Sequence, residues 1–209
     1  MPAVVQPRHK PLFRRREVHI RHTDLGKSER ASLLPQARED NVARQLRHRG
    51  HLSILETRHQ HWADEAACAD AAEALGRHTA LRDATIELHG PLGAGKTTFA
   101  RHLLRALCVQ GHVKSPTYAL MEPYEVTTAA GPLAISHFDF YRFDDPQEWE
   151  DAGFREVFAN PGLKLVEWPE KAAGLLPEPD LCIAIEPQPS EARAVRIDAR
   201  SARGRELLA

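Results

Sequence analysis

The sequence has few cysteines and no apolar run long enough to span a membrane. Its three cysteines, Cys68, Cys108 and Cys182, are far apart and odd in number, and no C-x-x-C motif is present. This pattern argues against a disulfide framework, gives little support to a zinc site and suits a reducing compartment, with each thiol a small buried side chain. Charged residues also stand near the N-terminus, where a secretory signal needs an apolar stretch. We therefore expect a cytoplasmic protein with no membrane partner.

The small net charge of −1 hides a split between two parts of the chain. Residues 1–59 hold thirteen Lys and Arg against six Asp and Glu, and residues 60–209 hold fifteen against twenty-three, so the parts carry +7 and −8. The first part lacks sustained periodicity, which predicts a basic, disordered extension. It could be an arm that contacts RNA phosphates, a dispensable tail, or a stretch translated from a wrongly chosen start, and basic runs are usually just solvated. A mitochondrial transit peptide is disfavoured because acidic residues interrupt the segment.

A glycine-rich segment carries the strongest functional signal. Residues 90–98 read Gly-Pro-Leu-Gly-Ala-Gly-Lys-Thr-Thr and match the whole phosphate-loop pattern G-x-x-x-x-G-K-[ST]. A β-prone run precedes it at residues 85–89, and a helical pattern follows at residues 97–107. Glycines let backbone N–H groups approach a polyphosphate, while the helix dipole and a lysine add positive charge, so the segment predicts binding of a nucleoside triphosphate. The expected binding residues are Gly90, Leu92, Gly93, Ala94, Gly95, Lys96, Thr97 and Thr98.

A triphosphate held in this way requires Mg²⁺, which prefers hard oxygen ligands. The hydroxyl of Thr97 is one ligand by its position after the lysine. A second ligand is expected from an acid at the carboxyl end of a hydrophobic strand. Asp139 follows the run 133–138 and Glu167 follows the run 163–166, so both qualify. Either one could instead be an ordinary solvated acid at a strand end.

A serine–proline–threonine segment comes after the phosphate-loop helix. Thr117 could place its hydroxyl or carbonyl near the γ-phosphate, as switch loops do. A simple proline turn into the next strand explains Ser115–Thr117 equally well. Arg142 could supply charge to the phosphates, or it could be a surface arginine. The residues alone leave both alternatives open.

Periodicity beyond residue 60 predicts helices alternating with strands. The expected helical segments are residues 64–76, 97–109, part of 146–158 and a short piece before Pro177. The expected strands are residues 85–89, 118–126, 133–139, 163–168, 181–185 and 194–197, of which 118–126 and 133–139 form a hairpin. We therefore predict an α/β domain over residues 60–209, a P-loop NTPase-like three-layer fold with a mixed, mainly parallel sheet.

Four blocks in this order resemble one known family. They are Gly-Pro-Leu-Gly-Ala-Gly-Lys-Thr-Thr-Phe from Gly90, Val-Lys-Ser-Pro-Thr-Tyr from Val113, His-Phe-Asp-Phe-Tyr-Arg from His137 and Leu-Val-Glu-Trp-Pro from Leu165. Over about residues 60–200 the chain resembles the bacterial tRNA threonylcarbamoyladenosine biosynthesis ATPases. The resemblance implies a small P-loop ATPase that uses ATP and Mg²⁺. It also implies two partners, a threonylcarbamoyl transferase subunit and its protease-like partner subunit, which modify the adenosine beside the tRNA anticodon.

The resemblance further implies roles for single residues. The family's Walker-type acid corresponds to Asp139, its second magnesium-associated acid and neighbouring tryptophan correspond to Glu167 and Trp168, and its switch-like segment corresponds to Ser115–Thr117. The implied metal ligands are Thr97, Glu167 and Asp139. The implied catalytic residues are Lys96, Asp139, Glu167 and Thr117, with Ser115 and Trp168 also at the nucleotide.

The chain departs from the family pattern at three places. Pro91 stands where the family usually has aspartate, which leaves the cluster of N–H groups intact. Cys68 occupies the place of a threonine that the family tends to carry near the nucleotide base, so the base contacts stay open. Residues 1–59 have no family counterpart.

The acidic charge of residues 60–209 bears on the expected mechanism. A domain with this net charge repels tRNA phosphates, so we expect it to act on tRNA indirectly, through the transferase complex. Two other functions share the phosphate loop. A small-molecule kinase would transfer phosphate to an acceptor, and a nucleotide-binding module would never hydrolyse its ligand.

Overall fold

The computed structural model describes residues 54–128 and 130–209. Most of the predicted basic extension, residues 1–53, therefore lies outside the described residues. The predicted start of the domain at residue 60 falls inside a strand, β1, which begins at Glu56. Leu55 already donates a backbone hydrogen bond to Ala199 at 2.8 Å, so the folded part starts earlier than the charge pattern indicated.

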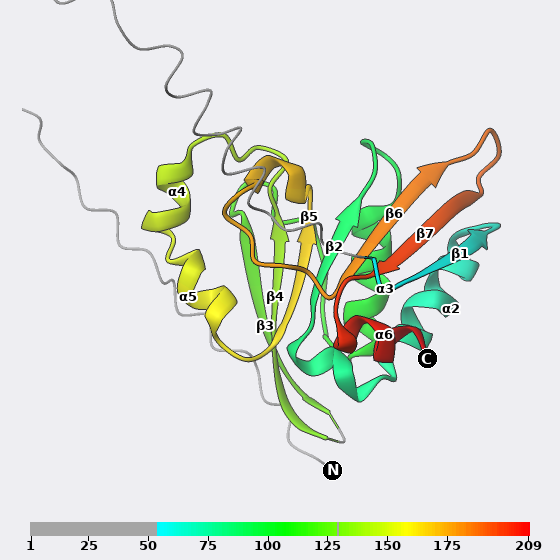
Figure 1. Cartoon of the computed structure of the whole chain (residues 1–209), viewed down its shortest axis with the longest axis horizontal. Helices are drawn as coiled ribbons and strands as arrows, with labels where there is room; N and C mark the ends of the chain where they lie inside the picture. Colours follow the sequence, from blue (N-terminus) through cyan, green and yellow to red (C-terminus); the bar gives the residue numbers. More distant parts are fainter. Residues whose placement is uncertain (1–53, 129) are drawn as a thin grey trace, which may run out of the picture. The chain divides into compact units, whose positions relative to one another are not determined.

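A seven-stranded mixed sheet forms the centre of the domain, in the order β1-β7-β6-β2-β5-β4-β3. The four central strands, β6, β2, β5 and β4, are parallel, and antiparallel pairs complete both edges. Figure 1 shows the arrowheads of these four strands at one edge of the sheet. The strands are β1 Glu56–Trp62, β2 Thr85–His89, β3 Met121–Thr128, β4 Gly131–Asp139, β5 Leu163–Glu167, β6 Leu181–Pro187 and β7 Arg193–Ala199.

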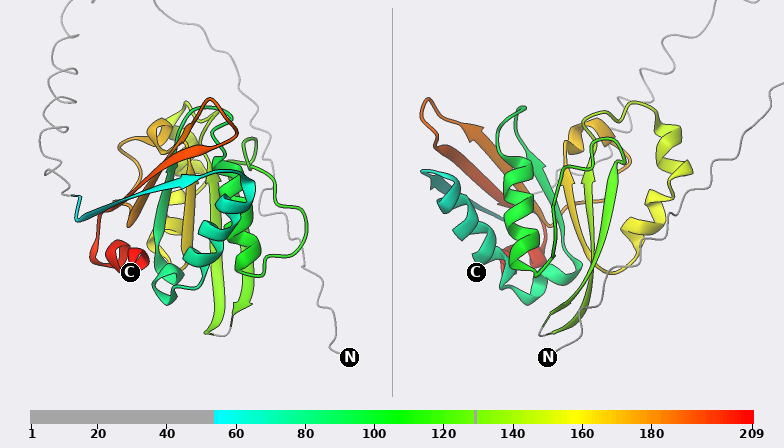
Figure 2. Two further views of the ribbon diagram at one scale, coloured as in Figure 1. Left: turned by 90° about the vertical axis from the view of Figure 1, so that its right-hand side faces the viewer. Right: turned by 180° about the vertical axis from the view of Figure 1, so that it is seen from behind.

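Helices lie on both faces of the sheet, which confirms the predicted α/β fold (Figure 2). The α-helices are α2 Glu65–Gly76, α3 Lys96–Ala106, α4 Pro146–Asp151, α5 Phe154–Ala159 and α6 Ala202–Leu208, and two short 3-10 helices are η1 Thr79–Asp83 and η2 Pro169–Ala172. None of the described helices is long and apolar enough to cross a membrane.

The alternation of side chains along β2 and β4 separates two hydrophobic cores. Ile86 and Leu88 point toward α2 and α3 and belong to the larger core, as does Ile135. Phe138 points to the opposite face and packs in an aromatic cluster with Phe154 of α5, their ring centroids 5.3 Å apart. Because successive strand residues face opposite sides, the remaining side chains of β2 stand on the face away from α3.

The regular elements of the interior agree with their sequence patterns. Asp64 caps α2, where its carboxylate accepts a hydrogen bond from the Ala67 N–H at 2.9 Å. The predicted hairpin is β3–β4, and the strands expected around residues 85–89, 163–168, 181–185 and 194–197 are β2, β5, β6 and β7. Three elements were not predicted from the sequence, β1, η1 and α6. Most of β1 is exposed and polar, so it shows no hydrophobic alternation.

Candidate functional site

The phosphate loop joins the end of β2 to the start of α3 at the sheet edge where the parallel strands end (Figure 1). Gly90, Gly93 and Gly95 have φ angles of 138°, 78° and 108°, a region that side chains strongly disfavour. A Cβ on Gly90 would lie 2.3 Å from the backbone oxygen of Ile185, so neighbouring β6 also requires glycine there. No side chain caps the start of α3, which leaves the first-turn N–H groups directed at the loop.

Lys96 lies at the mouth of this loop with only 4% of its surface exposed. Its ammonium donates to the backbone oxygens of Gly90 and Pro91 at 2.5 and 2.9 Å and lies 3.7 Å from the centroid of the Trp168 ring. Burial lowers the pKa of this ammonium from its ordinary value. The negative charges of nearby carboxylates act in the opposite direction, and Glu167 has the largest such effect. The loop and the lysine thus bring N–H groups and an ammonium together at one place, the combination that binds an anion.

Trp168 has an unusual backbone for a bulky residue, with φ 58° in the left-handed region. Such strain is uncommon and concentrates at functional sites. The conformation starts η2 and turns the indole over the Lys96 ammonium, with Tyr141 packed beside it at 4.9 Å between ring centroids.

The two predicted acids are neighbours on adjacent strands. Asp139 of β4 and Glu167 of β5 are paired in register, and both are buried, with 3% and 1% of their surface exposed. Glu167 accepts a hydrogen bond from the Thr97 hydroxyl at 2.7 Å. The structure therefore brings together the three residues predicted to bind Mg²⁺. Their carboxylate and hydroxyl oxygens are the donors that this ion prefers.

The Ser115–Thr117 segment contacts Asp139, not Glu167. Thr117 donates to the Asp139 carboxylate at 2.7 Å, and Ser115 also hydrogen-bonds to it. The other Asp139 oxygen accepts from the Tyr141 N–H at 2.9 Å. Each acid is thus connected to a different part of the site, Glu167 to α3 and Asp139 to the segment after α3.

Other predicted residues lie apart from this hydrogen-bonded group. Leu92, in the loop, is 73% exposed. Cys68 of α2 is buried in the core, where burial raises the pKa of its thiol to about 11. Arg142 stacks on the exposed ring of Tyr118, 4.4 Å from its centroid. Thr98 follows Thr97 in the first turn of α3. The expectation that all three thiols are buried is confirmed for Cys68 and wrong for Cys108, which is exposed, while Cys182 is only partly buried.

Sequence reasoning assigned no role to His137 or Arg193, which also belong to the site. The imidazole of His137 is fully buried and its Nε2 lies 2.9 Å from Glu167 Oε1, while its Nδ1 has no hydrogen-bond partner. Arg193 of β7 donates from Nε to the Ala94 carbonyl at 2.8 Å and so connects the loop to a distant strand. For His137 a signal was available, because it stands two residues before Asp139 on an apolar strand. Arg193 has no such signal, because it reaches the loop only through the order of strands.

Comparisons with known proteins agree on one family. The family model described as "Threonylcarbamoyl adenosine biosynthesis protein TsaE" matches residues 62–195. A tRNA threonylcarbamoyladenosine biosynthesis protein TsaE from Haemophilus influenzae is 42% identical over 59% of this chain and 75% of its own length. The Bacillus subtilis protein of the same name is 36% identical over 54% of this chain and 68% of its own.

A solved structure supports the fold independently. The crystal structure of YdiB from Bacillus subtilis superposes with a TM-score of 0.57 and covers 75% of this chain and 94% of that one. At 23% sequence identity, this likeness concerns the arrangement of helices and strands.

Proposed function

The chain belongs to the TsaE family of threonylcarbamoyl adenosine biosynthesis proteins, and from this membership we propose that it binds and hydrolyses ATP with Mg²⁺. The family takes part in the biosynthesis of threonylcarbamoyladenosine in tRNA. The proposed activity supplies the ATP-dependent step that supports this modification. One observation carries the proposal: a complete phosphate loop stands beside two buried, register-paired carboxylates, one of which accepts the Thr97 hydroxyl.

Each group has a proposed role. The N–H groups of the loop and the Lys96 ammonium bind the β- and γ-phosphates. Thr97 and Glu167 hold Mg²⁺, with Asp139 beside them, and the ion when bound offsets the negative charge of the phosphates. Trp168 covers Lys96 and limits the access of water to it. Ser115 and Thr117 respond to the γ-phosphate through their hydrogen bonds to Asp139.

The charge of the domain bears on whether it contacts tRNA directly. Residues 60–209 carry a formal charge of −8, which disfavours direct binding to tRNA phosphates. The family resemblance implies two partners, a threonylcarbamoyl transferase subunit and its protease-like partner. We propose that ATP binding and hydrolysis act on these proteins and that they contact the tRNA. A change in the Ser115–Thr117 segment would then alter the surface offered to the partner proteins.

The Lys96→Ala variant tests the proposal. Removing the ammonium should weaken ATP·Mg²⁺ binding by about a hundredfold, because charge-assisted hydrogen bonds to phosphate contribute about 1.5–3 kcal/mol each. Binding is measured by calorimetry, and tRNA modification by mass spectrometry of nucleosides from cells that depend on the variant. Lys171→Ala, which removes an exposed lysine in η2, is the matched control and should leave both unchanged. Normal modification in the Lys96→Ala cells would refute the proposal.

Two further measurements separate this ATPase from its rivals. A kinase must move label from γ-labelled ATP to an acceptor in a metabolite pool, whereas the proposed ATPase releases it as phosphate. A module that only binds nucleotide releases no phosphate even when the partner proteins are present.

A further inference from the structure

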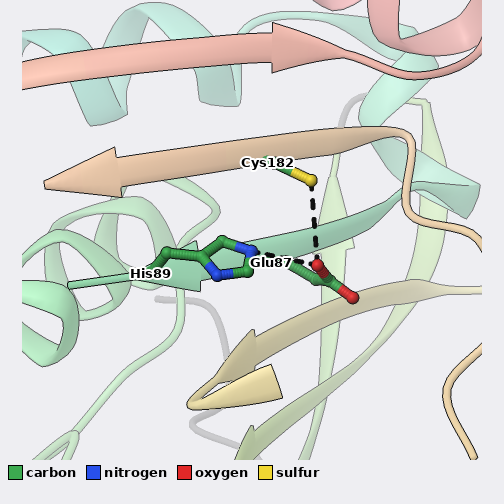
Figure 3. Close-up of side chains that lie close together, drawn as sticks. All are labelled: Glu87, His89 and Cys182. Carbon is green, nitrogen blue, oxygen red and sulfur yellow. Dashed lines mark hydrogen bonds and ion pairs between the residues drawn. The ribbon is translucent and has the colours of Figure 1, made fainter. Parts of the chain in front are cut away.

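A group of metal-ligating side chains lies on the face of the sheet opposite α3. Glu87 and His89 are two residues apart on β2, so they share this face, and Cys182 of β6 is the register partner of Glu87. Figure 3 shows the three side chains converging across the two strands. Their ligand atoms all lie within 4.8 Å of one another. His89 Nε2 is 3.0 Å from Glu87 Oε2, and Cys182 Sγ is 3.7 Å from the same oxygen.

The surroundings favour an ordered site that an ion can still reach. The side chain of Glu87 is 12% exposed and that of His89 is 35% exposed. The second ring nitrogen of His89, Nδ1, faces Glu170 Oε2 at 3.9 Å. This separation is longer than a hydrogen bond, so Glu170 adds negative charge near the ring but does not fix its orientation.

We propose that Glu87, His89 and Cys182 form a binding site for Zn²⁺, separate from the site predicted for Mg²⁺. The three donors are one oxygen, one nitrogen and one sulfur. Tetrahedral zinc sites use such mixed donors, whereas Mg²⁺ requires oxygens. Three protein ligands would leave the fourth position to water. The site has no recognisable sequence motif. Cys182 is almost a hundred residues away from Glu87 and His89 in sequence, and it meets them only because β6 pairs with β2.

The state of the thiol adds to the choice of ion. Burial, and next the charge of Glu87, raise the pKa of Cys182 to about 12, against the lowering effect of Arg200 nearby. When the Zn–S bond forms, the S–H bond breaks and its proton leaves to solvent. Sulfur is a donor that Zn²⁺ accepts readily and that the hard ions Mg²⁺ and Ca²⁺ do not, so the donor set favours Zn²⁺.

The site differs from the nucleotide site in its face and in its ligands. Ile86 and Leu88 point into the core beneath α3, so the side chains of Glu87 and His89 point away from that core. His89 nevertheless immediately precedes Gly90, the first residue of the phosphate loop. A bound ion would therefore connect β6 to the end of β2 from which the loop departs.

Cobalt substitution tests the proposal with a signal specific for sulfur. The full chain is treated with EDTA, transferred to metal-free reducing buffer and titrated with Co²⁺. One equivalent should produce a thiolate-to-cobalt charge-transfer band and the strong visible bands of a tetrahedral ion. Added Zn²⁺ should abolish them, and Mg²⁺ should not. The sulfur signal matters because the sequence holds twelve histidines that can bind cobalt without producing that band.

Matched variants identify the ligand. Cys182→Ser should lose the charge-transfer band, and Cys108→Ser, which removes an exposed thiol away from the cluster, should keep it. His89→Gln should keep the thiolate and weaken Co²⁺ binding at least about tenfold. ATP·Mg²⁺ binding, measured in parallel, should be unchanged in Cys182→Ser. No band in the wild-type chain, or the same band and affinity in Cys182→Ser or in His89→Gln, would overturn the proposal while leaving the proposed ATPase function untouched.

Discussion

At the scale of the residue, two histidine–glutamate pairs differ mainly in their exposure to water. His137 and Glu167 lie 2.9 Å apart with their side chains 0% and 2% exposed, and His102 and Glu65 lie 3.0 Å apart with theirs 15% and 67% exposed. When a buried carboxylate loses a hydrogen-bond partner, water cannot replace that hydrogen bond, whereas water can replace it at an exposed carboxylate. The same contact therefore has different consequences at the two places.

The two pairs give a matched test of that difference. His137→Asn should reduce the free energy of unfolding by about 1–3 kcal/mol, because Glu167 Oε1 is left without its buried partner. His102→Asn should reduce it by less than about 1 kcal/mol. Urea denaturation of both variants measures the difference. Equal losses would show that the buried contact contributes nothing beyond the exposed one.

A second prediction concerns the charge of Glu167. Glu167→Gln keeps the size of the side chain and an acceptor for the Thr97 hydroxyl but removes the negative charge. ATP hydrolysis in the presence of the partner proteins should fall at least about a hundredfold, because a charged metal ligand is lost, while nucleotide binding is partly retained. Glu65→Gln, an exposed carboxylate on α2, is the control and should hydrolyse ATP at the wild-type rate. Wild-type turnover in Glu167→Gln would reject its metal role.

At the scale of the element, the phosphate loop depends on strands that are far from it in sequence. The backbone of β6 passes so close to Gly90 that a side chain there would meet Ile185, and β7 supplies Arg193 to the Ala94 carbonyl. The loop is therefore held from one side by two C-terminal strands. Its sequence pattern alone does not show this support.

Two glycines of the loop separate crowding from backbone strain. In Gly90→Ala the new Cβ would lie 2.3 Å from the Ile185 oxygen, so we expect a loss of about 2–4 kcal/mol in the free energy of unfolding. In Gly93→Ala nothing lies within 4 Å of the new Cβ, so the strained φ alone should reduce stability by about 1–2 kcal/mol. Chemical denaturation compares them. A Gly93→Ala variant as unstable as Gly90→Ala would contradict the role of β6.

The contact from β7 can be tested through nucleotide affinity. Arg193→Leu removes the donor to the Ala94 carbonyl and should weaken ATP·Mg²⁺ binding about tenfold, since a hydrogen bond from a charged group contributes about 1.5 kcal/mol or more. Arg155→Leu is the control, because it makes the same substitution in an exposed ion pair, between Arg155 and Glu150, and should leave the affinity for ATP unchanged. Calorimetric titration measures both. An affinity for ATP in Arg193→Leu equal to that of the control would remove β7 from the nucleotide site.

The features that could be predicted from the sequence are those encoded by contiguous residues, and the features that were missed depend on contacts between distant segments. The β2–loop–α3 unit is encoded by contiguous residues, and the hairpin β3–β4 by two β-prone runs around a turn, so both were predicted correctly. The pairing of Asp139 with Glu167 was not predictable, because it depends on the register of β4 against β5. β1 was missed because an edge strand with exposed polar side chains lacks the alternation that marks a half-buried one.

At the scale of the whole molecule, most of β1 lies within the segment that the charge pattern assigned to the extension. Trp62, the last residue of β1, stacks on Phe99 of α3 with ring centroids 5.4 Å apart. The strand also pairs with β7 over its whole length. β1 is therefore part of the domain, and any shortened chain should start before it.

Two truncations test this boundary. A chain that begins at Ile54 keeps every contact that the described residues make with β1, and it should unfold at the same urea concentration as the full chain. A chain that begins at Ala63 loses Trp62 from the core and should be less stable by at least about 3 kcal/mol. Circular dichroism during denaturation measures both. A lower midpoint for the chain starting at Ile54 would place a stabilising contribution in the preceding residues.

The shared register of Asp139 and Glu167 constrains where this chain can gain or lose residues. Successive side chains of a strand point to opposite faces of the sheet. One residue inserted into β4 or β5 would therefore move Asp139 or Glu167, respectively, to the opposite face. Insertions and deletions in natural variants should therefore fall within residues 140–162, between the two strands, where α4 and α5 lie. Within that connection, changes of length should avoid the buried Trp149 and Phe154, which belong to the second core.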